Sequence, residues 1–285
     1  MKNILKNFLD YLPDSLYLRV LYFHIFKKTL NLKYPKTFNE KLQWLKLYDR
    51  NPIYTKMVDK YEVRKYIKNI IGEEYLIPLI GVWDDVNDID FDLLPNQFVL
   101  KCTHDSGSVY ICNDKKNFDI DKVKQDINKH LKKNFYYVGR EWPYKNVKPR
   151  IICEKYMIDS KTGELRDYKV FNFNGKSKYV QVDCNRFTKH TKNIYNTKWE
   201  FQDFEFNYKN DKTIIIEKPK LLDEMIKISE LLSKNITFLR TDFYIVNNKL
   251  YIGELTFFPA SGFGKFYPDS IDYELGTYLN LNESK

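Results

Sequence analysis

The first third of the chain spaces its apolar residues as amphipathic helices do. Three segments, 16–26, 40–48 and 53–71, carry apolar residues at helical spacing, and the last of them stops at Gly72. Glycine often follows the last residue of a helix because it adopts left-handed backbone angles without strain. The pattern predicts a mainly helical region over residues 1–95.

The pattern then changes to short apolar or alternating runs, which are typical of strands. The expected strands are 97–101, 108–112, 150–155, 166–173, 176–183, 238–246 and 249–256. Asn174-Gly175 between two alternating runs predicts a hairpin, and helices are expected after Asp119 and over 220–233. Hairpins and separate helices, without regular βαβ alternation, favour an α+β fold.

The composition is that of a globular protein rather than a disordered or fibrous one. Hydrophobic residues make up 43% and charged residues 30% of the 285 residues. The four cysteines have no CxxC spacing and no signal peptide is evident, which favours a cytoplasmic protein with reduced cysteines. The net charge of +9 suits an acidic partner such as nucleotide phosphates, but no run of five basic residues marks a nucleic-acid site.

The apolar segment 16–26 leaves two interpretations open. It falls short of the ~20 residues that a membrane-spanning helix needs. Lys27 and Lys28 follow it directly. A helix packed on its own domain and an amphipathic helix in peripheral contact with the inner face of the membrane both fit this pattern.

Residues 98–109 (FVLKCTHDSGSV) join an apolar strand to a small polar loop. The strand ends on Lys101, and the loop contains Ser106-Gly107-Ser108. Small residues let the backbone approach a ligand and direct N–H groups at one point, as a phosphate requires, and a lysine beside them adds positive charge. A phosphate-binding loop and a simple hairpin turn both fit, and the Walker A spacing is absent.

Residues 238–256 place charged residues inside two apolar strands. Arg240 and Asp242 share one face of the first strand, and Glu254 and Thr256 share one face of the second. Buried charge is costly unless it is paired or binds a cation, and two carboxylates with a hydroxyl suit Mg²⁺. Arg240 is suited to neutralise charge on a transferred phosphoryl group. An exposed ladder of charges is the alternative.

The register of this hairpin decides whether the charged side chains meet. A two-residue turn at Asn247-Asn248 alone would place Asp242 opposite Gly253, and Glu254 would then point to the other face. Asp242 and Glu254 face each other only with a three-residue turn or a β-bulge. We therefore predict one of these two devices.

With Glu154-Lys155-Tyr156-Met157, which ends another apolar strand, these motifs occur in the order found in the ATP-grasp superfamily, which the chain resembles. That superfamily includes D-alanine–D-alanine ligase and glutathione synthetase. The resemblance covers roughly residues 57–265. It implies an ATP-grasp fold, in which two α+β subdomains enclose ATP.

The resemblance also implies roles for individual residues. The implied nucleotide-binding residues are Lys60, Lys101, Ser106, Gly107, Ser108, Glu154, Lys155, Tyr156, Met157, Asp167 and Lys169, with residues 106–108 as a lid and 154–157 around the adenine. The implied Mg²⁺ ligands are Asp242, Glu254 and Thr256, and Thr256 stands where the superfamily usually has asparagine. Arg240 would act on the phosphoryl group, and Arg186 is a further candidate for binding the acyl phosphate or the substrate carboxylate.

Four segments narrow the resemblance to the TupA-like ATP-grasp proteins, which are associated with teichuronopeptide and other bacterial surface polysaccharides. These segments are 36–50, 76–85, 101–108 and 253–266. Membership would imply a ligase that uses ATP and Mg²⁺, activates a carboxylate as an acyl phosphate and joins it to an amine. A uronic acid of a surface or capsular polysaccharide, or of its precursor, is the expected acid.

The motifs suggest three regions along the chain. The helical region 1–95 would precede an ATP-grasp small subdomain with the phosphate-binding loop, 96–155, and a C-terminal subdomain with the metal site, 156–285. Residues 139–149 and 186–218 lack periodicity and are expected to be long loops, which often act as lids.

Two other functions remain open. Asp88-Ile89-Asp90 contains the DxD pattern that holds a metal and a nucleotide sugar in glycosyltransferases, although the connector that follows favours an acidic surface loop. The aromatic content of 16% and the positive charge also fit a non-catalytic polysaccharide-binding module.

Overall fold

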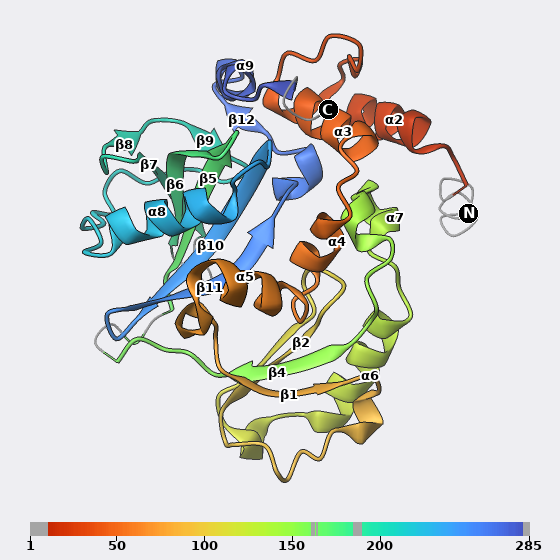
Figure 1. Ribbon diagram of the computed structural model, residues 1–285, viewed down its shortest axis with the longest axis vertical. Helices are drawn as coiled ribbons and strands as arrows, with labels where there is room; N and C mark the ends of the chain where they lie inside the picture. Colours follow the sequence, from red (N-terminus) through yellow and green to blue (C-terminus); the bar gives the residue numbers. More distant parts are fainter. Residues whose placement is uncertain (1–10, 161–162, 164, 185–189, 282–285) are drawn as a thin grey trace.

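Two large antiparallel sheets and a small two-stranded one, with helices around and between them, make up the described part of the protein (Figure 1). The computed structural model describes residues 11–160, 163, 165–184 and 190–281. Its α-helices are α2 (Asp14–Phe26), α3 (Phe38–Tyr48), α4 (Ile53–Val58), α5 (Val63–Ile71), α6 (Ile120–Leu131), α7 (Tyr136–Gly139), α8 (Leu222–Leu232) and α9 (Ser270–Thr277). Its strands are β1 (Leu79–Trp83), β2 (Phe98–Cys102), β3 (Val109–Cys112), β4 (Ile151–Lys155), β5 (Asp167–Phe173), β6 (Lys176–Cys184), β7 (Thr191–Asn196), β8 (Phe201–Gln202), β9 (Glu205–Phe206), β10 (Phe238–Val246), β11 (Lys249–Thr256) and β12 (Phe266–Tyr267).

The larger sheet has the strand order β11-β10-β5-β6-β7-β8. Helix α8 covers one of its faces, with Leu222, Met225 and Leu232 buried (Figure 1). The same hydrophobic core takes in Phe38 of α3 and Met57 of α4, so these two helices fold onto this sheet.

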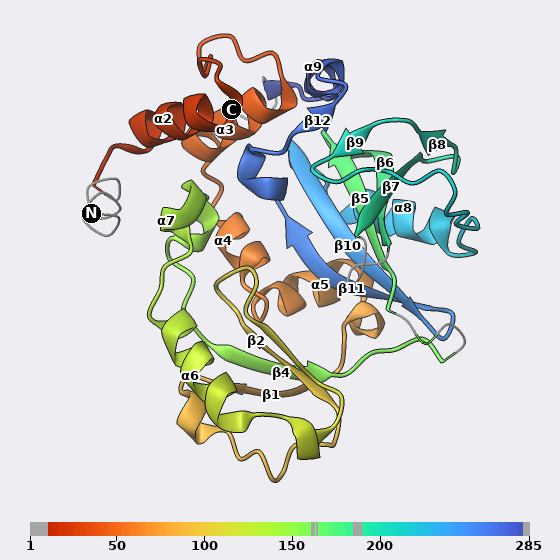
Figure 2. The same cartoon turned by 180° about the vertical axis from the view of Figure 1, so that it is seen from behind.

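The smaller sheet has the order β1-β4-β2-β3 and carries α6 on its outer side (Figure 2). Its separate core includes Leu100 and Ile127 together with Val86 and Phe91. Residues 79–94 therefore pack with the small sheet, although the sequence pattern grouped them with the N-terminal helices.

The helix expected over 53–71 is interrupted, because α4 ends at Val58 and α5 begins at Val63. The buried Asp59 carboxylate accepts a 2.8 Å hydrogen bond from the N–H of Tyr61. Such a local side-chain acceptor competes with the helical hydrogen bonds and turns the chain. The break brings the backbone N–H of Lys60 to 3.1 Å from the carbonyl of Thr103, in the loop after β2.

The loop expected over 186–218 is wrong for residues 191–206, which contain β7, β8 and β9. Strand β7 buries polar as well as apolar residues, and this hides the alternation that marks a strand. The amide of Asn193, for example, is buried and donates to the carbonyls of Asp211 and Ile214 at 2.8 and 3.2 Å.

The other sequence predictions agree well with the structure. The α+β class is confirmed, and the seven expected strands are present within a residue or so of their predicted bounds. Asn174 and Gly175 connect β5 and β6 with φ values of 47° and 75°, as a tight hairpin turn requires. Among the described residues, no helix is long and apolar enough to cross a bilayer.

Candidate functional site

A β-bulge in the β10–β11 hairpin sets the geometry of the site. The turn itself is a two-residue one at Asn247-Asn248, so that Val246 pairs with Lys249. One extra residue in β11 then shifts the register between Asp242 and Phe243, and Asp242 lies opposite Glu254. Directly opposite residues point to the same face of a sheet, so the predicted β-bulge is confirmed and the three-residue turn is not needed.

The register continues across the sheet and produces a polar row of four side chains, namely Glu254, Asp242, Lys169 and Gln181. Asp242 pairs with Glu254 on one side and with Lys169 on the other, and Lys169 pairs with Gln181. One position along the hairpin, Arg240 pairs with Thr256. All the predicted residues of the hairpin therefore lie on one face.

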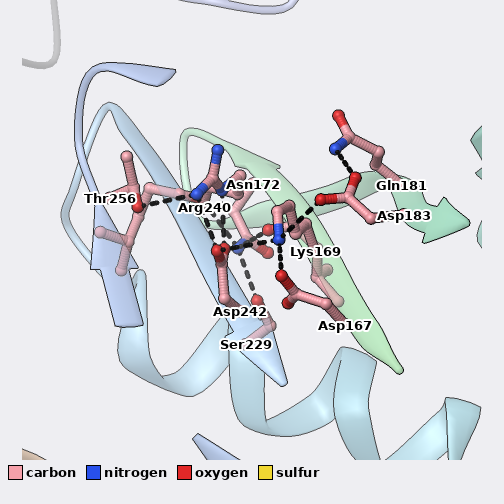
Figure 3. A network of polar contacts seen from close by, with 11 residues as sticks. Asp167, Lys169, Asn172, Gln181, Asp183, Ser229, Arg240, Asp242 and Thr256 are labelled. Carbon is pink, nitrogen blue, oxygen red and sulfur yellow. Dashed lines mark hydrogen bonds and ion pairs between the residues drawn. The ribbon is translucent and has the colours of Figure 1, made fainter. Parts of the chain in front are cut away.

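Arg240 binds Asp242 through two parallel hydrogen bonds, from Nε at 2.6 Å and from Nη2 at 2.7 Å (Figure 3). The same Nη2 donates to the Thr256 hydroxyl at 3.1 Å. Burial opposes the charge of Arg240, but the adjacent Asp242 more than offsets burial and raises the pKa of the guanidinium. Thr256 therefore orients Arg240, and its role as a metal ligand stays a prediction.

The Lys169 ammonium lies among three carboxylates (Figure 3). It forms ion pairs with Asp167, with Asp183 at 3.4 Å and with Asp242 at 3.5 Å. Burial alone would lower the pKa of Lys169, but Asp242 and Asp167 more than offset burial and raise it. Burial raises the pKa of the Asp167 carboxyl group, and Lys169 opposes this shift. Lys169 is thus held as a buried cation that neutralises this part of the sheet.

Of the two predicted carboxylate ligands of Mg²⁺, Glu254 is open to a cation, whereas Arg240 engages both oxygens of Asp242. The Glu254 carboxylate is half-buried, and within the described part of the chain no hydrogen bond or ion pair engages it. The Asp242 carboxylate lies opposite it and is paired with Arg240 and Lys169. Across the described residues no group of three His, Cys, Asp or Glu side chains could by itself enclose a metal. Two carboxylates suit Mg²⁺, which completes its coordination shell with phosphate oxygens and water.

The predicted phosphate-binding loop is anchored at its base and open at its tip. Ser106 and Gly107 are exposed, and Gly107 has a φ of 101°, which favours glycine. Ser108 is buried instead, and its hydroxyl donates to the Asp105 carboxylate. The other oxygen of Asp105 contacts Nδ1 of His130 on α6. The Ser108 hydroxyl therefore anchors the loop, and only Ser106 and Gly107 are exposed as a lid requires.

Two lysines approach this loop from different elements. Lys60, between α4 and α5, donates to the backbone carbonyl of Asp105. Lys101, at the end of β2, forms a 2.6 Å ion pair with Glu154 of β4. Glu154 also accepts from Arg64 of α5 at 3.3 Å, so one carboxylate joins the small sheet to the helix between the two sheets.

The four predicted adenine-site residues do not share one environment. Glu154 points into a small cavity, whereas Lys155 and Tyr156 line an open hollow on the small sheet. Met157 packs with Ile77 and Val246 in a minor core of its own. Residues 154–157 therefore face three different environments.

The small cavity brings the two halves of the site together. Lys60, Lys101 and Glu154 line it from one side and Glu254 from the other. Its volume of about 30 Å³ holds one or two water molecules. This cavity is therefore far too small for a nucleotide.

A buried cluster beside the hairpin escaped the sequence analysis. Lys46 of α3 donates to the carbonyls of Gly139 and Ser261 at 2.6 and 2.7 Å. Burial lowers the pKa of Lys46 to about 7 and raises the pKa of Glu141, which faces it. The cluster fixes the residues that follow β11 against the N-terminal helices.

Other contributing residues also lacked a sequence signal. The partners of Arg64, Asp105 and His130 lie far away in the chain. Asp183 is the exception, because it lies two residues after Gln181 on β6 and follows the alternation of a predicted strand. Arg186 lies outside the described residues.

Comparison with known proteins agrees with this geometry. A family model described as TupA-like ATP-grasp matches residues 40–280. No curated protein matches the chain.

Solved structures of ATP-grasp ligases are similar at low sequence identity. D-alanine–D-alanine ligase from Bacillus anthracis in complex with ATP is 17% identical over 70% of this chain, with a TM-score of 0.41. This chain covers 53% of that ligase, about half its length. D-alanine–D-alanine ligase from Helicobacter pylori is 17% identical, with a TM-score of 0.44. The match covers 86% of this chain and 70% of the length of that ligase. The ATP-grasp ligase PsnB in complex with Mg, ADP and a variant of its minimal precursor is 9% identical, with a TM-score of 0.45. The match covers 87% of this chain and 66% of the length of PsnB.

Proposed function

The chain belongs to the TupA-like ATP-grasp family, and on that premise we propose that it is an ATP- and Mg²⁺-dependent carboxylate–amine ligase. The bulged hairpin carries the proposal, because it aligns Arg240, Asp242 and Glu254 on one face and leaves the Glu254 carboxylate on the cavity wall opposite Lys101. Without the bulge, the two-residue turn would have placed the two carboxylates on opposite faces of the sheet.

The proposed reaction has two steps. A substrate carboxylate oxygen attacks the γ-phosphorus of ATP, the bond to the bridging oxygen breaks, and ADP leaves. An amine then attacks the carbonyl carbon of the acyl phosphate, loses a proton and expels inorganic phosphate. The product is an amide.

The residues of the site supply charge for these steps. Lys60 and Lys101 would bind the nucleotide phosphates, and Ser106-Gly107 would close over them. Asp242 and Glu254 would hold Mg²⁺, which supplies charge neutralisation at the phosphates when bound. Arg240 is held rigidly by Asp242 and Thr256, as a group that stabilises developing charge must be.

We extend the proposal to the substrate. A uronic acid of a bacterial surface or capsular polysaccharide, or of its precursor, is the acid that the family suggests, and an amino acid or a simple amine is the acceptor. We place this reaction in the cytoplasm, where ATP is available.

The test is a screen for ADP release with ATP, Mg²⁺ and a panel of acids that includes uronic acids. An acid that stimulates release should form a hydroxamate when hydroxylamine replaces the amine. Glu254→Gln should lose this activity, whereas Glu230→Gln, a matched change at a lysine-paired glutamate on α8, should keep it. If no acid stimulates ADP release and a nucleotide sugar is consumed instead, the proposal is wrong.

The DxD segment gives little support to a glycosyltransferase. Asp88, Asp90 and Asp92 are exposed, and Asp90 accepts a 2.9 Å hydrogen bond from the N–H of Asp92 within a surface turn. The apolar residues between them, Ile89 and Phe91, are buried in the core of the small sheet. The acidic residues are thus the solvent-facing side of a connector.

A further inference from the structure

Helix α2 is apolar on two faces, and the described residues cover only one of them. Its inner face, with Leu18 and Tyr22, packs with Leu30 and Leu32 in a small core against α3. Its outer face carries what we call the α2 stripe, Leu16, Val20 and Phe23, which are 46%, 48% and 55% exposed. A helix that is apolar all round is normally buried, so the α2 stripe lacks a partner in the described structure.

The stripe is formed by helical geometry and is not scattered. Leu16, Val20 and Phe23 are spaced by four and three residues, which places them side by side on one face of the helix. The helix lies at the edge of the molecule, on the opposite side from the small sheet and α6 (Figures 1 and 2). A large, flat partner can therefore reach the stripe without touching the candidate site.

The charge around the stripe identifies the kind of partner. Residues 15–39 contain five lysines and arginines and no aspartate or glutamate. Arg19 is exposed beside Val20, Lys27 is exposed one turn beyond Phe23, and Lys33 and Lys36 are exposed in the following loop. Lys28 is paired with the exposed Asp269, and the remaining basic residues border the stripe. Exposed apolar residues bordered mainly by cations complement an anionic lipid surface, where each basic residue adds attraction to that of the buried apolar area.

An aromatic residue completes the surface. Tyr34, in the same loop, is 66% exposed, and the Lys33 ammonium lies 5.3 Å from its ring centroid. Tyrosine favours the boundary between headgroups and acyl chains, because its ring is apolar and its hydroxyl is polar. We propose that the α2 stripe and the basic loop after it dock the protein on an anionic bilayer.

The test uses the full chain and vesicles of defined composition. The protein should sediment with phosphatidylcholine vesicles that contain phosphatidylglycerol, should not sediment with pure phosphatidylcholine, and should be released by added salt. Leu16→Gln/Val20→Gln/Phe23→Gln should lower the bound fraction at least tenfold, and Lys27→Glu/Lys33→Glu should also lower it. Lys122→Glu/Lys132→Glu, which makes the same change in net charge on and just after α6, should bind like the unaltered protein.

Thermal unfolding midpoints of the variants should match that of the unaltered protein, because all the altered side chains are exposed. The proposal is overturned if the protein ignores anionic vesicles or if the glutamine variant binds them normally. It is also overturned if the glutamine changes convert a dimer into a monomer, since a second copy then covers the stripe. ADP release, measured on the same variants, should be unchanged, which keeps this test separate from that of the ligase activity.

Discussion

Replacing Lys169 by methionine tests whether this residue neutralises the acidic centre of the large sheet. Methionine keeps most of the length of the side chain and removes the charge. Asp167, Asp183 and Asp242 would then face one another without the cation that all three contact. Arg240 would remain beside Asp242 only.

The expected cost follows from burial, because the Lys169 side chain is 8% exposed and those of its three partners are 3–6% exposed. Removing one partner of a buried ion pair leaves an uncompensated charge and costs about 3–5 kcal/mol of unfolding free energy at neutral pH. Burial already raises the pKa of Asp167 above its ordinary value of 3.8, and loss of Lys169 would raise it further. The folded variant then holds protons that the unfolded chain has released, so its stability should fall as the pH rises above about 4.

Urea unfolding followed by circular dichroism at several pH values measures this effect. Lys169→Met should lose most stability near neutral pH and less in acid, and the added change Asp167→Asn should recover part of the loss. Lys176→Met is the matched control, because Lys176 pairs with Glu230 at the surface of the same sheet and should cost less than about 1 kcal/mol. A Lys169→Met variant as stable as the unaltered protein at every pH would show that the carboxylates do not depend on this lysine.

Three further changes probe the rest of the site. Glu254→Gln should remove the Mg²⁺-dependent part of the thermal stabilisation by ATP, and an unchanged shift would take Glu254 out of the metal site. Lys101→Ala should weaken ATP binding at least tenfold, and normal binding in a nucleotide titration would exclude a phosphate contact. Ser108→Ala should leave the Asp105 carboxylate one donor short, lower stability by about 1–2 kcal/mol and raise the KM for ATP more than it changes kcat. Equal effects on KM and kcat would instead indicate general damage to the fold.

The sequence alone predicted the parts of this structure that depend on local rules. Alternation located seven of the strands but missed β1, which lies in the region expected to be mainly helical. Counting from Asp242 to Glu254 required one extra residue in the hairpin, and the structure has it at the bulge in β11. Strand β7 was missed because Asn193 is buried by hydrogen bonds to distant carbonyls, and such bonds leave no trace in a hydrophobic pattern.

The sequence pattern also could not predict which residues pair with one another in the site. Nothing near Lys101 in the chain indicates Glu154 as its partner, and nothing near Asp105 indicates His130. These pairs depend on how β2, β4 and α6 come together, which the packing of the small sheet decides. The break at Asp59 was likewise missed, since one carboxylate turned a helix that the apolar spacing would have continued.

If Lys101 contacts the nucleotide phosphates as proposed, its ion pair with Glu154 must first be broken. The Glu154 carboxylate occupies the position that an incoming anion would seek, and it is tethered by Arg64 on its other side. An anion that contacts Lys101 alone must displace a partner held at high effective concentration, so free phosphate and other small anions gain little by binding. A triphosphate that also engages Lys60 and a metal gains enough binding energy to displace Glu154 from Lys101. On this proposal, the resting site favours ligands that bind at several points at once, before any specific contact with the adenine is made.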